Sequence, residues 1–287
     1  MYKLFVTFFL TVSIIRVLFG IDMSQNLHRN RREQMQKAEP NDIAVDANNI
    51  NVTVVYDNNP YKEGLKTAWG FSCIITGTEK TILFDTGGNG QLLLENMAKT
   101  HVDVNSIEIV VLSHIHGDHT GGLQKFIKKN PKVDVYLPKS FPRRFKEKVA
   151  LLGAKVIEVD KKTKICKNVY STGQLGKLIK EQGLVLRTEK GLVIITGCAH
   201  PGIVKMVKTA KDFFNEPVLL VMGGFHLQWA DKEKIENIIK AFEDINVKYA
   251  GPCHCTGEKA RSFFAKHFTD HYVNVGVGRL VEIKDLR

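Results

Sequence analysis

The sequence predicts an α/β fold from about Asn51 onward. Short β-branched runs alternate with amphipathic segments, which is the pattern of strands and helices in turn. The composition, 44% hydrophobic and 25% charged over 287 residues, provides enough apolar material for a large buried core. Several apolar runs end in glycine-containing turns with polar residues, as strands do where they leave a sheet.

Residues 1–22 precede this fold and carry an apolar run. Leu4–Ile15 has the length of a signal-peptide core, whereas continuation through Ile21, despite Arg16, gives about the length of a membrane span. A signal peptide predicts export, and an uncleaved anchor followed by basic residues predicts a cytoplasmic domain at the membrane. A start at Met23 would remove the run and also predict a cytoplasmic protein.

Residues 23–50 are polar with little periodicity, which predicts a linker, and residues 51–287 form the predicted folded domain. The candidate strands are Val52–Tyr56, Gly70–Ile75, Thr81–Phe84, Ile107–Leu112, Val133–Leu137, Leu184–Arg187, Leu192–Thr196, Val218–Met222 and Val247–Ala250. The candidate helices are Gln91–Ala98, Gly121–Lys129, Arg143–Leu152, Ile203–Phe213, Lys232–Asp244 and Glu258–His267.

The formal net charge is +11, and much of it lies in the middle third of the chain. A basic surface attracts polyanions or phosphorylated small molecules, but it is also typical of the exterior of a soluble protein. No RNA-binding or recognition-helix motif accompanies the charge. We therefore expect a small-molecule substrate, phosphorylated or not, and no nucleic acid, while the oligomeric state is not predicted.

The five cysteines, Cys73, Cys166, Cys198, Cys253 and Cys255, are odd in number and irregular in spacing, which does not indicate a disulfide framework. The last two flank a histidine but lack the second ligand pair of a structural zinc site. That histidine, His254, is therefore the candidate functional residue of this segment.

The clearest chemical pattern lies at residues 114–119. The strand Ile107–Leu112 leads into His114-Ile115-His116-Gly117-Asp118-His119, and a glycine-rich turn follows. Such a sheet edge is where α/β folds place ligands. Imidazole suits zinc and iron, and a carboxylate adds a harder ligand. Two histidines at i and i+2 can bind one ion, while Asp118 and His119 can face a second.

This run resembles the hallmark of the metallo-β-lactamase superfamily, His-x-His-x-Asp-His after an apolar strand. Phe84-Asp85-Thr86-Gly87-Gly88 looks like the Asp-Thr-Gly turn of the same superfamily. Three later segments, Gly197–Ile203, Gly223–Leu227 and Pro252–Gly257, are similar to a narrower branch, the dihydropterin–ribofuranosylaminobenzene phosphate synthase-like proteins. The resemblance spans about residues 51–283 and implies an αββα sandwich of two mixed sheets flanked by helices.

The resemblance also implies a ligand set. His114 and His116 would bind one metal, Asp118 and His119 a second, and His254 fits the last superfamily ligand. The implied cofactor is a pair of divalent transition ions, zinc in the first place, with manganese or iron as alternatives. Asp85 would accept the ring N–H of a ligating histidine rather than bind a metal.

The middle ligands depart from the superfamily pattern. Members usually supply a histidine and then a bridging aspartate, but no histidine lies between His119 and His200. Cys198 stands where the aspartate normally falls, and His200 would supply an imidazole from the same turn. Both are candidate metal ligands, and the number and identity of the metals stay open.

His226 follows the strand Val218–Met222 and a Gly-Gly turn, so we expect it at the same sheet edge. It is a candidate metal ligand, but a substrate-facing or acid–base role is an equal alternative, and a simple strand-end hydrogen bond is the third. Asp118 is the second candidate acid–base residue, because it can return a proton to the leaving group.

These observations predict a metal-dependent hydrolase in which a metal-bound hydroxide attacks an ester, lactone or phosphoester. A transferase of the synthase type, which the branch implies, is one alternative. A non-catalytic metal-binding or redox module that uses Cys198 and the Cys253–Cys255 pair is the other.

Overall fold

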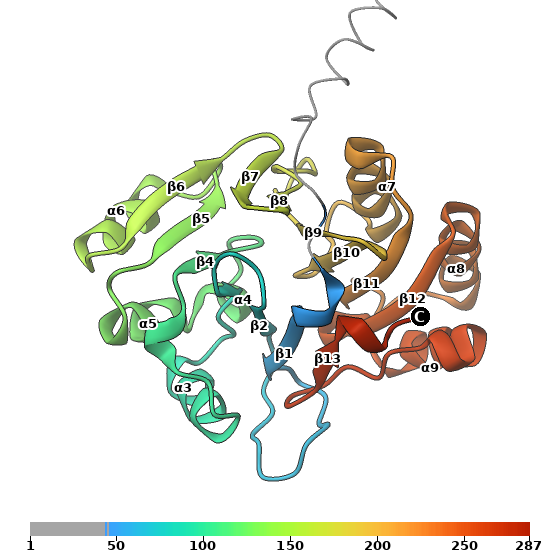
Figure 1. The fold of residues 1–287 in the computed structure, drawn as a ribbon, viewed down its shortest axis with the longest axis horizontal. Coiled ribbons are helices and arrows are strands. Elements are labelled where there is room, and N and C mark those ends of the chain that lie inside the picture. Colours follow the sequence, from blue (N-terminus) through green and yellow to red (C-terminus); the bar gives the residue numbers. More distant parts are fainter. Residues whose placement is uncertain (1–43, 45) are drawn as a thin grey trace, which may run out of the picture. The chain divides into compact units, whose positions relative to one another are not determined.

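The protein is described from a computed structural model, and the described residues are 44 and 46–287 (Figure 1). The predictions for residues 1–22 and for most of the linker lie outside them. Ala47 and Ile50 are buried, and the 3₁₀ turn η1 (Ala47–Asn49) precedes the first strand, so the packed domain reaches slightly upstream of Asn51. None of the described helices has the length and apolar character to cross a bilayer.

Two mixed β-sheets form the centre of the described domain. The first has the order β13-β1-β2-β3-β4-β5-β6 and the second β12-β11-β10-β9-β8-β7. The first sheet comprises β1 (Asn51–Tyr56), β2 (Ser72–Thr76), β3 (Ile82–Phe84), β4 (Ile109–Val111), β5 (Asp134–Pro138), β6 (Lys155–Val159) and β13 (Leu280–Glu282). The second comprises β7 (Thr163–Cys166), β8 (Val169–Ser171), β9 (Leu184–Thr188), β10 (Gly191–Thr196), β11 (Val218–Gly224) and β12 (Val247–Cys253).

Helices cover the outer face of each sheet (Figure 1). Helices α3, α5 and α6 pack on the first sheet and α7, α8 and α9 on the second, which gives the predicted αββα sandwich. The helices are α3 (Gly90–Lys99), α4 (Gly117–Thr120), α5 (Leu123–Lys129), α6 (Arg143–Leu151), α7 (Ile203–Phe214), α8 (Lys232–Ile245) and α9 (Glu258–Phe268). Further 3₁₀ turns are η2 (Val104–Ser106), η3 (His254–Thr256), η4 (Thr269–His271) and η5 (Ile283–Asp285).

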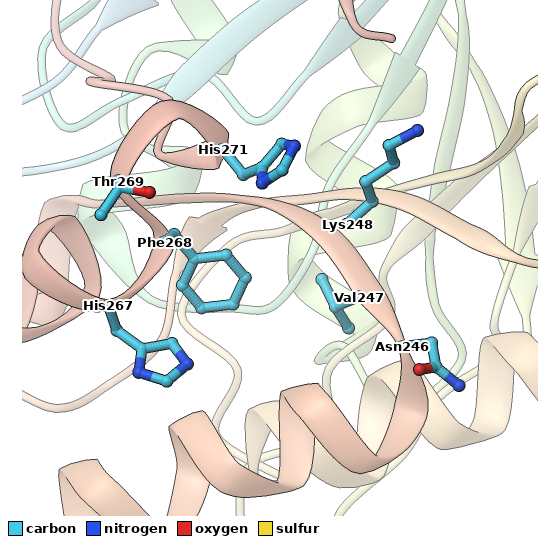
Figure 2. A pocket seen from close by; sticks show the side chains of 7 residues that line it. All are labelled: Asn246, Val247, Lys248, His267, Phe268, Thr269 and His271. Carbon is cyan, nitrogen blue, oxygen red and sulfur yellow. The ribbon is translucent and has the colours of Figure 1, made fainter.

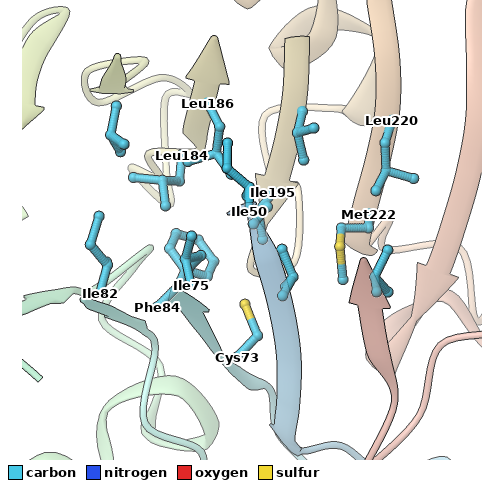
Figure 3. Close-up of a cluster of buried hydrophobic side chains, with 14 of the residues drawn as sticks. Ile50, Cys73, Ile75, Ile82, Phe84, Leu184, Leu186, Ile195, Leu220 and Met222 are labelled. Carbon is cyan, nitrogen blue, oxygen red and sulfur yellow. The ribbon is translucent and has the colours of Figure 1, made fainter. Parts of the chain in front are cut away.

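The main core lies between the two sheets (Figure 3). Side chains alternate along each strand, so in β2 Cys73 and Ile75 face the second sheet while Ile74 packs in the outer cluster with the helices. In β10, Ile195 faces the first sheet and Ile194 packs under the helices. Because both faces are buried, these strands are continuous apolar runs, and for that reason the sequence predicted them.

Four strands were not predicted, namely β6, β7, β8 and β13. Three of them, β6, β7 and β13, are outer strands of their sheets. An outer strand has one neighbour and keeps polar side chains, such as the exposed Lys155 of β6 and Lys164 of β7, so no continuous apolar run marks it. The fourth, β8, has only three residues.

Candidate metal centre

The predicted site residues follow strands that end at one edge of each sheet. Strands β3 and β4 are parallel neighbours in the first sheet, and β10, β11 and β12 are parallel neighbours in the second. The carboxyl ends of parallel neighbours meet at the same edge. The sandwich thereby brings the turns after all five strands together, as the sequence analysis expected for that edge.

Asp85 follows β3 and orients two of the histidines. Its Oδ1 accepts the backbone N–H of Ser113 at 2.7 Å, and its Oδ2 accepts the Ser113 hydroxyl and the Nδ1–H of His119, each at 2.7 Å. Because the Ser113 hydroxyl donates to Asp85, it accepts from Nδ1 of His114, 2.9 Å away. The Nε2 atoms of His114 and His119 are thus left as lone-pair donors. The prediction that Asp85 accepts a histidine ring N–H is confirmed.

His254 begins η3 directly after β12, with a left-handed backbone (φ 47°). Its Nδ1 lies 2.9 Å from Oδ1 of Asn58, and Nδ2 of Asn58 donates to the His254 carbonyl at 3.3 Å. An amide oxygen only accepts, so Nδ1 of His254 carries the proton and Nε2 is a free lone pair. The Trp69 ring packs beside this imidazole, with 4.8 Å between ring centroids.

The turn after β10 carries Cys198 and His200. The backbone N–H groups of Cys198, Ala199 and His200 donate to the buried carboxylate of Glu181 at 2.9, 2.8 and 2.8 Å. Burial raises the pKa of Glu181 to about 6, although these three bonds favour its charged form. Glu181 therefore fixes the backbone of this turn.

Gly197, just before this turn, lies against the Asp85–Ser113 pair. A Cβ atom at this position would stand 2.1 Å from Oγ of Ser113 and 2.9 Å from Oδ2 of Asp85. Only a glycine lets the second sheet approach the first so closely here.

These side chains form two groups of candidate ligands, and within each group the ligand atoms lie within 4.8 Å of one another. We call them the tri-imidazole group and the mixed group. The tri-imidazole group is His114, His116 and His200, and the mixed group is Asp118, His119, Cys198 and His254. All seven residues predicted as metal ligands are thus at this edge.

The distances within the mixed group suit a tetrahedral transition ion. Nε2 of His119 lies 3.2 Å from Nε2 of His254 and 3.2 Å from Sγ of Cys198. Oδ2 of Asp118 lies 3.3 Å from Nε2 of His254 and 3.6 Å from Nε2 of His119. Ligands around a tetrahedral zinc ion with bonds of about 2.0–2.3 Å stand roughly 3.3–3.6 Å apart.

The same group requires positive charge. With their Nδ1 atoms committed to Asp85 and Asn58, the two Nε2 atoms of His119 and His254 face each other as lone pairs and repel unless a cation lies between them. Burial lowers the pKa of His119, but the Asp85 carboxylate outweighs burial and raises that pKa to about 9. A proton or a metal ion can satisfy this demand, and the two compete for the same nitrogen atoms.

The tri-imidazole group is more open. Nε2 of His114 lies 3.1 Å from Nδ1 of His116, and the His200 ring lies 4.8 Å from each of those two rings. Burial, together with the neighbouring imidazoles, holds the pKa of His114 well below its usual range, so this ring is neutral and able to bind a metal. Nε2 of His200 is buried without a hydrogen-bond partner among the described residues, as expected of an atom that binds an ion.

His226 borders the centre without joining either group. Its ring lies 4.4 Å from that of His200, its backbone is left-handed (φ 56°), and its side chain is exposed. A hydrogen bond to Cys255 raises its pKa. With Cys198 and His200 it forms a third set of potential ligands. The structure thus leaves both of its predicted roles, acid–base group and metal ligand, within reach of the centre.

Three residues around the centre were not assigned a role from the sequence, namely Ser113, Asn58 and Glu181, and Cys255 was considered only for the metal-binding or redox alternative. Ser113 directly precedes the histidine run. Its polar side chain at the end of an apolar strand was the one sequence feature that could have indicated a role at the centre. Cys255 contacts Cys198, since its Sγ lies 3.6 Å from the Cys198 carbonyl oxygen and its hydrogen bond to Cys198, with burial, raises the pKa of that thiol. Its neighbour Cys253 is instead buried against Asp57 and belongs to none of the ligand groups found among the described residues.

A surface hollow of about 470 Å³ lies at the opposite end of β12 from His254 (Figure 2). It is lined by Asn246–Lys248, His267–Thr269 and His271. Nε2 of His267 already pairs with Glu243 at 2.9 Å, and the His271 ring packs against Tyr249. Its histidines are thus engaged elsewhere, and no candidate ligand group of the described residues includes them.

The fold and the centre together define a class of protein: a two-sheet α/β sandwich with a cluster of imidazole, carboxylate and thiolate ligands at one sheet edge. Residues 70–202 match the metallo-beta-lactamase superfamily. A 7,8-dihydropterin-6-methyl-4-(β-D-ribofuranosyl)-aminobenzene-5′-phosphate synthase from Methanocaldococcus jannaschii is 29% identical over 279 residues, covering 80% of this chain and 95% of the relative.

Solved structures agree. A metal-dependent hydrolase of the β-lactamase superfamily is 30% identical, covers 81% of this chain and 98% of its own, and superposes with a TM-score of 0.69. A metallo-β-lactamase fold protein from Bacillus subtilis, 15% identical, covers 82% of this chain and 99% of its own with a TM-score of 0.61, a likeness of fold alone.

The chain belongs to the metallo-β-lactamase superfamily. The predicted superfamily is therefore confirmed, and the branch predicted from the three later motifs is represented among the relatives by the synthase.

Proposed function

We propose that this protein is a metal-dependent hydrolase of an ester, lactone or phosphoester. One ion would bind to the tri-imidazole group and one to the mixed group. The observation that carries the proposal is the facing pair of imidazole lone pairs in the mixed group, Nε2 of His119 and Nε2 of His254, 3.2 Å apart. Zinc suits the nitrogen and sulfur donors best, and manganese or iron suits the carboxylate and imidazoles as well.

When bound, such ions supply an acidified water molecule as the nucleophile and a positive charge that polarises the bond under attack. The chain itself then moves protons. Asp118 is partly exposed, and its pKa is held below the usual range because His254 and His119 outweigh the effect of burial. This low pKa makes Asp118 a weak base and a strong acid, which suits the donation of a proton to the leaving group better than the removal of one from the nucleophile. His226, exposed beside His200, is the second candidate for that proton transfer.

Metal analysis with a substrate panel tests the proposal. The purified protein should contain two equivalents of transition metal and hydrolyse at least one chromogenic ester, lactone or phosphodiester. His116→Ala should lose one equivalent and the turnover, whereas the control His101→Ala, at an exposed histidine outside all candidate ligand groups of the described residues, should keep both. Two bound metals without turnover of any substrate would contradict the hydrolase and favour the metal-binding or redox alternative.

A transferase is the second candidate function, and the synthase relative favours it. In that reaction a pterin diphosphate would be joined to a ribosyl-aminobenzene phosphate, with diphosphate as the leaving group, and the basic middle third of the chain would suit the phosphates. Product formation from these two substrates, with no hydrolysis of the panel under any metal, would favour the transferase over the hydrolase.

A His226→Gln variant tests the role of that residue. If His226 transfers a proton, turnover should fall by about 10²–10⁴-fold while the metal content stays at two equivalents. Loss of one equivalent would instead assign His226 to the third ligand set.

A further inference from the structure

A second feature of the same edge is a pocket of about 470 Å³ that opens beside the candidate metal centre. Its volume is within the range of small-molecule sites. It is lined by Trp69, His226, Gln228, Trp229, Ala230, Asp231, Lys234 and Cys255. His226 and Cys255 connect it to the centre, because Cys255 contacts Cys198 and the His226 ring lies 4.4 Å from that of His200.

The chain contains two tryptophans, and both line this pocket. Trp229 is 91% exposed and Trp69 is 49% exposed. An exposed indole keeps a large apolar face in water, and covering that face with another ring is favourable. Two such faces beside a cluster of metal ligands therefore indicate a binding surface rather than a chance exposure.

Both tryptophans stand on anchored backbone. Trp69 packs on the ring of His254, which Asn58 holds from the other side. Trp229 lies between β11 and α8, in a segment tied down on each side of it: the N–H of Gln228 donates to the Cys255 carbonyl at 3.2 Å, and that of Ala230 to the Leu227 carbonyl at 2.9 Å. The ring of Trp69 and the backbone that carries Trp229 are thus held in place before binding, which reduces the entropy lost on binding.

We propose that this pocket binds a planar aromatic or heteroaromatic ring of the substrate, through contacts with the faces of Trp69 and Trp229. The inference rests on the proposed function only in assigning the ring to the substrate of the adjacent centre. The Asp231 carboxylate at the pocket caps α8 by accepting the backbone N–H of Lys234 at 2.8 Å, so the Lys234 ammonium is the charged group that suits an anionic substituent on that ring. An aliphatic ring of the same size would lack the stacking contribution.

A matched pair of ligands tests the proposal. Phenylphosphonate and cyclohexylphosphonate carry the same anionic group on a flat and a puckered ring, and neither has an ester bond to hydrolyse. We expect the full chain with its metals to bind the phenyl compound about two- to tenfold more tightly, the increment of one aromatic pair. Intrinsic fluorescence should change on binding, since both indoles of the chain lie at the pocket.

Variants assign this preference to the indoles. In calorimetric titrations, Trp229→Leu and Trp69→Leu should each reduce the preference for the phenyl compound, because leucine keeps an apolar side chain but has no ring face. Tyr61→Leu is the matched control, because Tyr61 is an exposed aromatic residue of the same β1–β2 loop as Trp69 but does not line the pocket. It should leave the preference unchanged.

Three results would overturn the inference: equal affinity for the two phosphonates, a preference that survives both tryptophan variants, or self-association in light scattering that shields Trp229, which would make a second copy of the chain the occupant. The results that would contradict the proposed function differ from those that would contradict the ring site. Ester hydrolysis without ring preference leaves the hydrolase standing and removes the ring site, whereas a tryptophan-dependent preference without turnover supports the ring site and contradicts the hydrolase.

Discussion

The mixed group and the tri-imidazole group differ in how their rings are oriented. In the mixed group, both histidines have their outer nitrogen bonded to a fixed acceptor, His119 to Asp85 and His254 to Asn58. In the tri-imidazole group only His114 has such a partner, through Ser113. The rings of the mixed group are thus positioned before an ion binds.

Burial differs in the same direction: three of the four residues of the mixed group are buried, against only His114 in the tri-imidazole group. His119, Cys198 and His254 are buried, whereas His116 and His200 are only partly so. Among the described residues, Nε2 of His200 has no hydrogen-bond partner, while the backbone N–H of His200 is bonded to Glu181. Since partners of the ligands raise metal affinity, we expect the mixed group to bind its ion more tightly.

Among the tests of this difference, we expect the largest effect from stepwise removal of the metals. A chelator titration should remove the ion of the tri-imidazole group first and that of the mixed group at higher chelator concentration, and hydrolysis should fall to background. Metal content and turnover measured on the same samples give the order, with His116→Ala and His254→Ala marking the two ions. Simultaneous loss of both ions would contradict the comparison.

Asp85→Asn should weaken both groups, because the carboxylate orients His119 directly and His114 through Ser113. Removal of such an outer partner typically costs 10- to 100-fold in metal affinity. Competition with a chromophoric chelator measures the affinity of each site. Asp160→Asn, an exposed aspartate away from the centre, is the control. A loss confined to one ion would mean that Ser113 does not transmit the effect.

Glu181→Gln should destabilise the fold and loosen the tri-imidazole group more than the mixed group. The amide can accept from the Cys198 and Ala199 N–H groups but places a donor against the N–H of His200. A buried polar group left unsatisfied costs about 1–3 kcal/mol in unfolding free energy. Denaturant unfolding measures the loss, and metal analysis should show the tri-imidazole ion more depleted. Unchanged unfolding would contradict the anchoring role of Glu181.

Ser113→Ala and Asn58→Ala form the smallest and most selective test. Each removes one partner of one histidine, so we expect about a tenfold loss of affinity in one group only. Ser113→Ala should affect the tri-imidazole group and Asn58→Ala the mixed group, in the same competition assay. If both variants weakened the same ion, the division into two groups would be wrong.

Much of the fold could be predicted from the sequence because its central strands are apolar on both faces. Runs such as Leu192–Thr196 and Val218–Met222 stand out for that reason, and the outer strands β6 and β7, which carry exposed lysines, do not. The ligands were predictable because they follow these same strands and form dense local motifs.

The supporting residues were not predictable in the same way. Glu181 and Asn58 lie in irregular segments without a pattern, and Asn58 is 196 residues from the histidine it orients. Their roles depend on long-range packing that no local spacing encodes.

The ligand groups that Cys198 and His200 join could not be predicted from the sequence either. The turn places Cys198 in the mixed group and His200 in the tri-imidazole group, and Ala199 between them has a left-handed backbone with φ of 61°. Both were candidate ligands from the sequence, and the structure also brings the two together in the third set, with His226.

Each ligand group draws on both halves of the sandwich: the run after β4 supplies residues from the first sheet, and the turns after β10 and β12 supply the rest from the second. An ion in either group would therefore act as a cross-link between the sheets, closing a long loop much as a disulfide does. We expect metal loading to raise the melting temperature of the whole domain, so that the cofactor contributes to cohesion as well as to reactivity.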